Sequence, residues 1–160
     1  MAFSIHDKSF WLWLIPNESS VNEINLIRSK IKINNGTTNF PIHITLGQID
    51  NLTPSLYSKV EKISYKLPLL EDEFRCRINY DNYFNSIVLV PNDLHSFNKN
   101  LHLILSKIPY KFNINRDTHL SLAYTKLERN FNNIVYFNSV KFSKLAIAFV
   151  DEENQIWKIL

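Results

Sequence analysis

PIHITLG, residues 41–47, alternates apolar and polar side chains, and the fold prediction starts from this stretch. In an extended chain Ile42, Ile44 and Leu46 fall on one face, while His43 and Thr45 fall on the other together with Gly47. A period of two is typical of a half-buried β-strand. We therefore predict a strand here that carries a single polar stripe.

The same design recurs in THLSLAY, residues 118–124. The alternation predicts one face with His119, Ser121 and Ala123, and an opposite face with Leu120, Leu122 and Tyr124. Each stretch thus contains a tetrad of the form histidine, apolar, hydroxyl, apolar. If the two strands are neighbours in one sheet, both histidines and both hydroxyls face a common cleft.

The rest of the chain alternates between helical and extended periodicity, which predicts a mixed α+β class. Apolar residues at helical spacing predict helices over residues 19–32, 53–65 and 91–107. Thr53 and Pro54 offer an N-cap followed by proline at the first helical position. The predicted remaining strands are 9–15, 74–80, 83–90, 134–137, 140–150 and 156–160.

Composition is consistent with one domain over residues 1–160, with 45% hydrophobic residues and a net charge of +3. The only cysteine is Cys76, which excludes an intrachain disulfide and a cysteine-based metal cluster. A reducing intracellular setting is expected. The apolar run from Phe10 to Ile15 is too short for a signal peptide or a membrane span, so no membrane association is expected.

The paired tetrads suit phosphodiester chemistry. Such a reaction needs one group that removes a proton from the attacking oxygen and another that protonates the leaving oxygen. Histidine titrates close enough to neutrality for either role, so His43 and His119 suffice without a metal. Hydroxyl donors from Thr45 and Ser121 would stabilise the charge that develops on the nonbridging oxygens.

A single histidine in such a pattern is more often a structural residue than a catalyst. Two matching tetrads in a chain with five histidines favour catalysis. The remaining three, His6, His95 and His102, have no comparable context. The sequence does not decide which of His43 and His119 is the base.

Four further stretches, together with the tetrads, resemble the two-histidine (2H) phosphoesterase superfamily and, within it, the cyclic phosphodiesterase branch. They are FWLWLIP (10–16), YDNYFNSIVLV (80–90), HLSLAY (119–124) and LAIAFVDEENQIWKI (145–159). The resemblance implies a bilobal fold, in which two pseudo-symmetric antiparallel sheets with outer helices face each other across a central groove. It implies hydrolysis of ADP-ribose 1″,2″-cyclic phosphate or nucleoside 2′,3′-cyclic phosphates, with no cofactor.

The chain departs from that branch immediately before each histidine. The branch usually has proline there, whereas this sequence has Ile42 and Thr118, with Pro41 one residue earlier. The stretch after Tyr124 is also short and rich in asparagine. These differences bear on substrate identity more than on the class of reaction.

Aromatic residues are candidate substrate contacts, with core packing as the alternative for each. Trp13 and Phe84, with Tyr83 beside it, could stack on a nucleobase. Tyr124 could contact the phosphate, but the alternation puts it opposite His119, so a β-bulge would be needed. Three cations flank the second tetrad and could attract a phosphate: Lys111, Arg116 and Lys126.

Two other functions compete with cyclic phosphodiester hydrolysis. One is degradation of 2′,5′-oligoadenylate or of cyclic oligonucleotide defence signals, and the other is a nucleotide or RNA-end binding module without turnover. The near balance of charge argues against long nucleic acid, because backbone binding needs clustered cations. The expected partner is a small nucleotide or short oligonucleotide, bound by a monomer.

Overall fold

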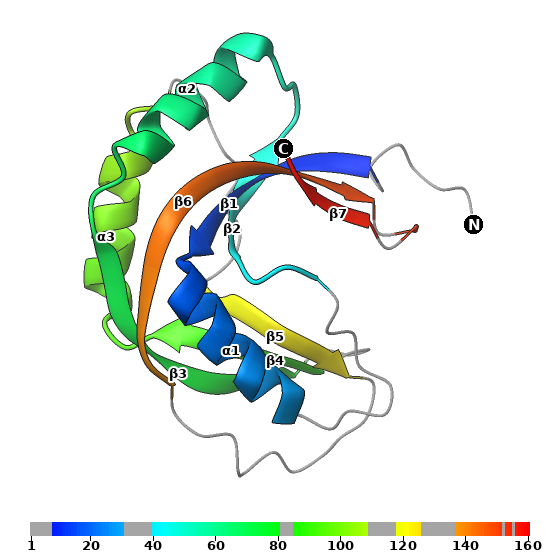
Figure 1. The fold of residues 1–160 in the computed structure, drawn as a ribbon, viewed down its shortest axis with the longest axis vertical. Coiled ribbons are helices and arrows are strands. Elements are labelled where there is room, and N and C mark those ends of the chain that lie inside the picture. Colours follow the sequence, from blue (N-terminus) through cyan, green and yellow to red (C-terminus); the bar gives the residue numbers. More distant parts are fainter. Residues whose placement is uncertain are drawn as a thin grey trace.

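The computed structural model describes residues 8–30, 40–80, 85–108, 118–125, 137–151, 153–154 and 156–160 (Figure 1). Its helices are α1 (Glu18–Lys30), α2 (Pro54–Tyr65) and α3 (Leu94–Leu105). Its strands are β1 (Lys8–Pro16), β2 (Ile44–Ile49), β3 (Leu70–Tyr80), β4 (Asn85–Pro91), β5 (Leu120–Thr125), β6 (Phe137–Asp151) and β7 (Ile156–Ile159).

The strands form one antiparallel sheet in the order β1-β2-β5-β4-β3-β6-β7. An additional pairing of β1 with β6 closes six of them into a ring. The long, curved β6 makes this possible, because its first residues pair with β3 and the rest pair with β1 (Figure 1). At the far side the ring is closed by a single bridge between β2 and β5.

The predicted α+β class is confirmed, whereas the predicted arrangement in two sheets is not. The 15 residues of β6 extend through both halves of the molecule, so the hydrogen bonding is continuous. Separate strands were expected at residues 134–137 and 140–150, whereas the structure has one strand, β6, from Phe137 onwards. Residues 134–136 lie outside the described residues. The turn expected at residues 151–154 is confirmed, since Asp151 accepts hydrogen bonds from Asn154.

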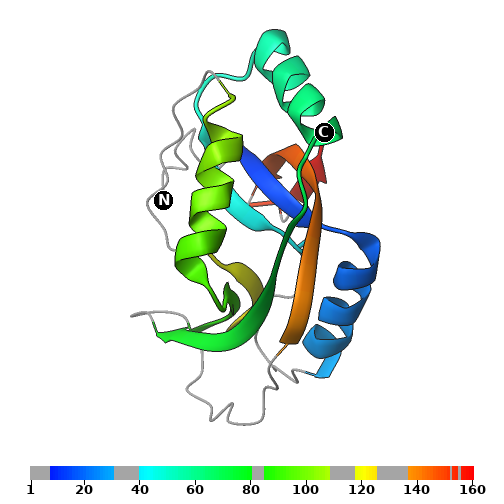
Figure 2. The same cartoon turned by 90° about the vertical axis from the view of Figure 1, so that its left-hand side faces the viewer.

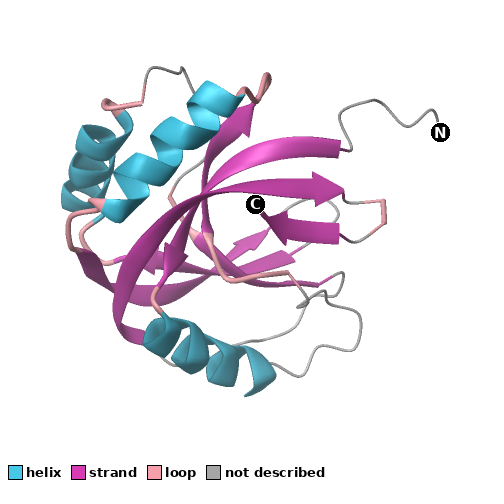
Figure 3. Cartoon of the chain, turned by 45° about the horizontal axis from the view of Figure 1, so that its top comes forward, coloured by secondary structure: helices cyan, strands magenta, loops and turns pink. Residues whose placement is uncertain are grey.

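The main core lies between the helices and one face of the sheet. Figure 2 shows α3 and α1 on either side of β6, and Figure 3 shows the helices outside the strands. The helices contribute Ile24, Leu56, Val60, Phe97, Leu101, Ile104 and Leu105, and the strands contribute alternate residues such as Leu12, Leu14, Ile44, Leu120 and Leu89. The residues between these strand positions therefore point to the opposite face of the sheet.

The predicted start of α2 is confirmed by its cap, whereas α3 begins at Leu94, later than the predicted residue 91, because Pro91 still belongs to β4. The Thr53 hydroxyl accepts a hydrogen bond from the Leu56 amide at 3.1 Å, with Pro54 at the start of α2. The Asp93 carboxylate accepts one from the Ser96 amide at 3.0 Å. Among the described residues, we find no helix with the length and apolar character needed to cross a membrane.

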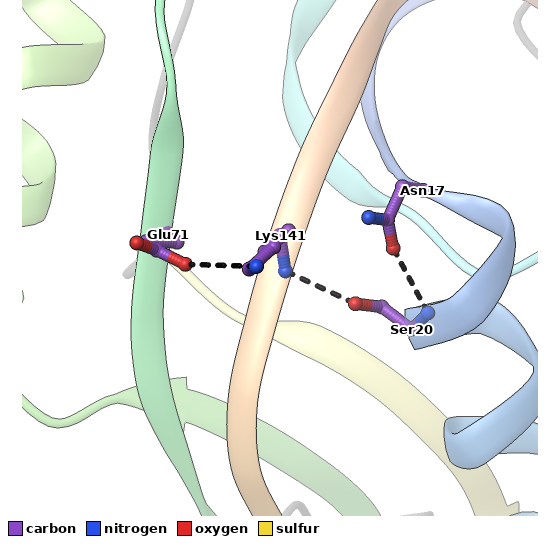
Figure 4. Close-up of polar contacts among 4 residues, drawn as sticks. All are labelled: Asn17, Ser20, Glu71 and Lys141. Atoms are coloured by element: carbon purple, nitrogen blue, oxygen red, sulfur yellow. Dashed lines mark hydrogen bonds and ion pairs between the residues drawn. The ribbon is translucent and has the colours of Figure 1, made fainter.

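Helix α1 is fixed to β6 by two hydrogen bonds of the Lys141 backbone, and Figure 4 shows the one to Ser20. Asn17 caps the helix by accepting from the Ser20 amide at 2.9 Å, so the helix begins at Glu18, slightly before the expected position. The Asn17 amide donates to the Lys141 carbonyl at 2.7 Å, and the Lys141 amide donates to the Ser20 hydroxyl at 3.1 Å. Lys141 also pairs through its side chain with Glu71, at 3.9 Å.

Replacing Ser20 with alanine is expected to lower the free energy of unfolding by about 1–3 kcal/mol, because the part-buried Lys141 amide would lose the buried Ser20 hydroxyl as its acceptor. Urea denaturation of wild type and Ser20→Ala measures the difference. The adjacent, exposed Ser19 provides the control, and Ser19→Ala should change the unfolding free energy by less than about 0.5 kcal/mol. Equal losses in the two variants would contradict the proposed role of the Ser20 hydroxyl.

Candidate active site

The bridge between β2 and β5 brings the two histidine tetrads together. Ile44 lies directly opposite Leu120, and both side chains are fully buried in the main core. Continuing this antiparallel register by one residue sets His43 opposite Ser121 and Thr45 opposite His119. All four polar residues alternate with core residues, so they belong to the face that the helices do not cover.

The two tetrads also share a local irregularity. On β1, Leu12 pairs with Gly47 and Trp13 pairs with Thr45, so Leu46 is an extra residue in β2. On β4, Ile87 pairs with Ala123 and Val88 pairs with Ser121, so Leu122 is an extra residue in β5. Each bulge therefore falls at the fourth position of its tetrad. Bulges of this kind are common beside functional sites, where they redirect side chains.

His43 is held by three neighbours. Its ring stacks on Trp13, with centroids 3.6 Å apart and an interplanar angle of 13°. Phe40 meets the same ring edge-on at 6.4 Å. The His43 Nδ1 lies 2.7 Å from the Pro41 carbonyl oxygen, which fixes the rotation of the ring.

These contacts determine the protonation state of His43. A carbonyl can only accept a hydrogen bond, so Nδ1 carries the proton of the neutral ring and Nε2 keeps a lone pair. Burial lowers the pKa of His43 to about 4. The hydrogen bond to Pro41 opposes this shift, while the charges of Arg28 and His119 add to it. At neutral pH, His43 is therefore a neutral imidazole with Nε2 available as a proton acceptor.

The lowered pKa makes stability depend on pH. The folded pKa of about 4 lies below the ordinary 6.5, so acid protonates His43 in the unfolded chain first. The resulting stability contribution is complete above pH 6.5 and is lost as the pH falls towards 4. Relative to His43→Gln, wild type should lose about 3 kcal/mol of unfolding free energy between pH 7 and pH 4. Urea denaturation across this range checks the change, and a constant difference between the two proteins would contradict it.

Arg28 of α1 supports the segment that leads to His43. Its guanidinium donates to the Phe40 carbonyl at 2.9 Å and lies over the Phe40 ring, with Cζ 4.6 Å from the centroid. Burial lowers the pKa of Arg28 to about 10, so it stays charged at neutral pH. Phe40 also contacts Trp157 of β7 at 6.3 Å. A helix, a loop and the last strand thus meet next to His43.

For Trp13 the structure supports packing, one of the two alternatives considered from the sequence. Its side chain is only 2% exposed, and His43 occupies one face of its ring, so it supports the histidine and does not form an open surface for a nucleobase. Trp157 is partly exposed and belongs to the same apolar cluster as Trp13. This residue is therefore better placed for that contact.

The bulge that Tyr124 required is present in β5, and Tyr124 pairs with Ser86 of β4. The bulge also corrects the face predicted for Ala123, which packs in the main core with Leu120 and Leu122.

Ser121 is 8% exposed, whereas His95 and His102 are exposed on α3. Other residues considered from sequence lie outside the described residues: His6, Tyr83, Phe84, Lys111, Arg116 and Lys126.

Sequence analysis missed Phe40, Arg28, Trp157 and Arg77. Arg77 pairs with Val88, which pairs with Ser121, so this cation shares the face of the histidines. The alternation of arginine with apolar residues in FRCRI, residues 74–78, was an available signal. Phe40 and Arg28 had no comparable signal, because the fold alone brings them to His43.

No model of a known protein family matches the chain, and a search of the curated proteins finds no match. Among the described residues, we find no group of three or more histidine, cysteine, aspartate or glutamate side chains suited to a metal ion.

Proposed function

We propose that this protein is a phosphodiesterase of the two-histidine class, which hydrolyses a small nucleotide cyclic phosphate. The preferred substrates are ADP-ribose 1″,2″-cyclic phosphate and nucleoside 2′,3′-cyclic phosphates. The supporting observation is the bridge between Ile44 and Leu120. When its register is continued, each histidine lies opposite the hydroxyl residue of the other tetrad.

In the proposed reaction His43 is the general base. Its neutral Nε2 takes a proton from water while the water oxygen forms a bond to phosphorus. His119 donates a proton to the leaving oxygen as the bond from phosphorus to that oxygen breaks. The ring opens to a phosphomonoester, and proton exchange with solvent restores both histidines.

Thr45 and Ser121 are the proposed phosphate ligands. In the register of the bridge each lies opposite the histidine of the other tetrad, so their hydroxyls can donate to the nonbridging oxygens as charge builds on them. Arg77, on the same face, adds positive potential towards an anionic substrate. The proposed contact for the base is Trp157, because aromatic faces stack on bases without sequence preference.

Three further expectations also belong to this proposal. They are the two pseudo-symmetric halves implied by the resemblance, an intracellular location and a monomer. The matching bulges after Thr45 and Ser121 support the pseudo-symmetry. The order of strands around the ring supports it too, since β1 borders β2 as β4 borders β5.

The test is hydrolysis in excess chelator of ADP-ribose 1″,2″-cyclic phosphate, 2′,3′-cyclic AMP and 2′,5′-oligoadenylate, with products separated by chromatography. We expect turnover of at least one cyclic phosphate by wild type, and turnover lower by about 10²-fold or more by His43→Ala. If wild type cleaves only the oligoadenylate, the substrate class is an oligonucleotide and the paired-histidine mechanism still holds. Binding of these compounds without turnover by wild type would refute the enzymatic proposal.

A further inference from the structure

A pocket is lined by residues of α2, of α3 and of the segments that follow these helices. Figure 1 shows the two helices on the side of β6 that faces away from β7. The volume of the pocket is about 510 Å³, within the range typical of small-molecule sites. Apolar residues from both helices, Ile63 and Ile104, line it together with Pro68. Tyr65, which is 85% exposed, stands at its edge.

Four lysines surround this apolar lining: Lys59, Lys62, Lys66 and Lys107. Lys59, Lys62 and Lys66 recur at helical spacing along one face of α2, and Lys107 follows the end of α3. No acidic residue lines the pocket. Within the described parts of the chain, the four ammonium groups form no ion pair.

Helix dipoles account for only part of this charge. Lys62 lies in the last turn of α2, Lys66 caps its end, and Lys107 follows α3, so each offsets the partial negative charge of a helix C-terminus. Each terminus carries about half an elementary charge, so two termini balance about one lysine of the four. Lys59 lies further from the helix end. A net positive potential therefore remains over the apolar lining.

We propose that this pocket binds a nucleotide carrying two or more phosphates, at a site separate from the histidines. The lysines would contact the phosphates, since four cations exceed what a single phosphate needs. Tyr65 and Pro68 would offer flat surfaces to the base. The ligand is either a free nucleotide or the phosphorylated end of an oligonucleotide, because both present the same groups. The proposal is independent of catalysis at His43.

Titrations followed by NMR of the isoleucine methyl groups test this site. The probes are ADP, the 5′-phosphorylated deoxydinucleotide of adenine, and inorganic pyrophosphate. We expect saturable shifts at Ile63 and Ile104 with ADP or the dinucleotide, and little shift at Ile42 and Ile44 beside His43. Tighter binding of the dinucleotide would indicate an oligonucleotide end, and tighter binding of ADP a free nucleotide.

The variant Lys62→Gln/Lys66→Gln should lose these shifts at moderate salt. For the dinucleotide, the slope of log affinity against log salt should fall in magnitude by about 1.4 for two lost phosphate contacts. Lys99→Gln/Lys144→Gln has the same net charge, removes exposed lysines outside this pocket, and should behave as wild type. The proposal fails if the shifts are absent, if both variants bind equally, or if pyrophosphate alone binds as tightly as ADP.

Discussion

Replacing either His43 or His119 with alanine is expected to lower kcat/KM for the preferred cyclic phosphate by about 10²- to 10⁴-fold, the usual contribution of a general acid or base. The reaction needs a proton acceptor and a proton donor at the same time, so neither histidine can act alone. Steady-state rates of the purified variants measure the loss, and urea denaturation establishes that each variant is folded.

The chain provides matched controls on α3. His95 and His102 are exposed there, and alanine at either position should leave kcat/KM unchanged. The double variant His43→Ala/His119→Ala should lose little more than one single variant, because residues that act as a unit are not additive. A single variant that keeps wild-type activity would contradict the paired-histidine mechanism.

Trp13→Ala is expected to lower the free energy of unfolding by about 3–5 kcal/mol, the usual cost of truncating a buried tryptophan. This would be a large part of the total, since domains are stable by about 5–15 kcal/mol. The substitution also removes the ring on which His43 stacks. The pKa of His43 should then rise from about 4 towards 6.5, because the imidazole becomes hydrated.

Trp13→Phe keeps an aromatic partner and allows the His43 titration to be followed by NMR even if the alanine variant does not fold. Trp11→Ala is the matched control, since Trp11 is only partly buried at the edge of the same cluster. It should cost less stability and leave the His43 pKa unchanged. Equal losses from Trp11→Ala and Trp13→Ala, with no change in the His43 pKa, would refute the supporting role of Trp13.

The sequence alone predicted the elements whose structure is determined by residues close together in the chain. The alternation around His43 and His119 predicted two strands, and Thr53 predicted the start of one helix. In each case, the signal and the structure lie within a few residues of each other. The juxtaposition of the tetrads was conditional on strand pairing, which the Ile44 and Leu120 bridge provides.

Features that depend on distant parts of the chain could not be predicted. The pairing of β1 with β6 joins residues more than 120 positions apart, and no local pattern encodes it. The stacking of Trp13 on His43 depends on the bulge at Leu46, which shifts the register of β1 against β2. The contact of Arg28 with Phe40 depends on where α1 docks on β6, through Ser20 and Lys141.

The pairing of β1 with β6 also has a consequence for synthesis. Translation proceeds from the N-terminus to the C-terminus, so β1 leaves the ribosome before β6. The hydrogen bonds between β1 and β6 can form only after β6 has followed. Until then the apolar residues Leu12 and Leu14 lack a neighbouring strand on one side. Loop closure over such a separation is slow, so the nascent chain carries an unprotected strand edge at least until β6 has been synthesised.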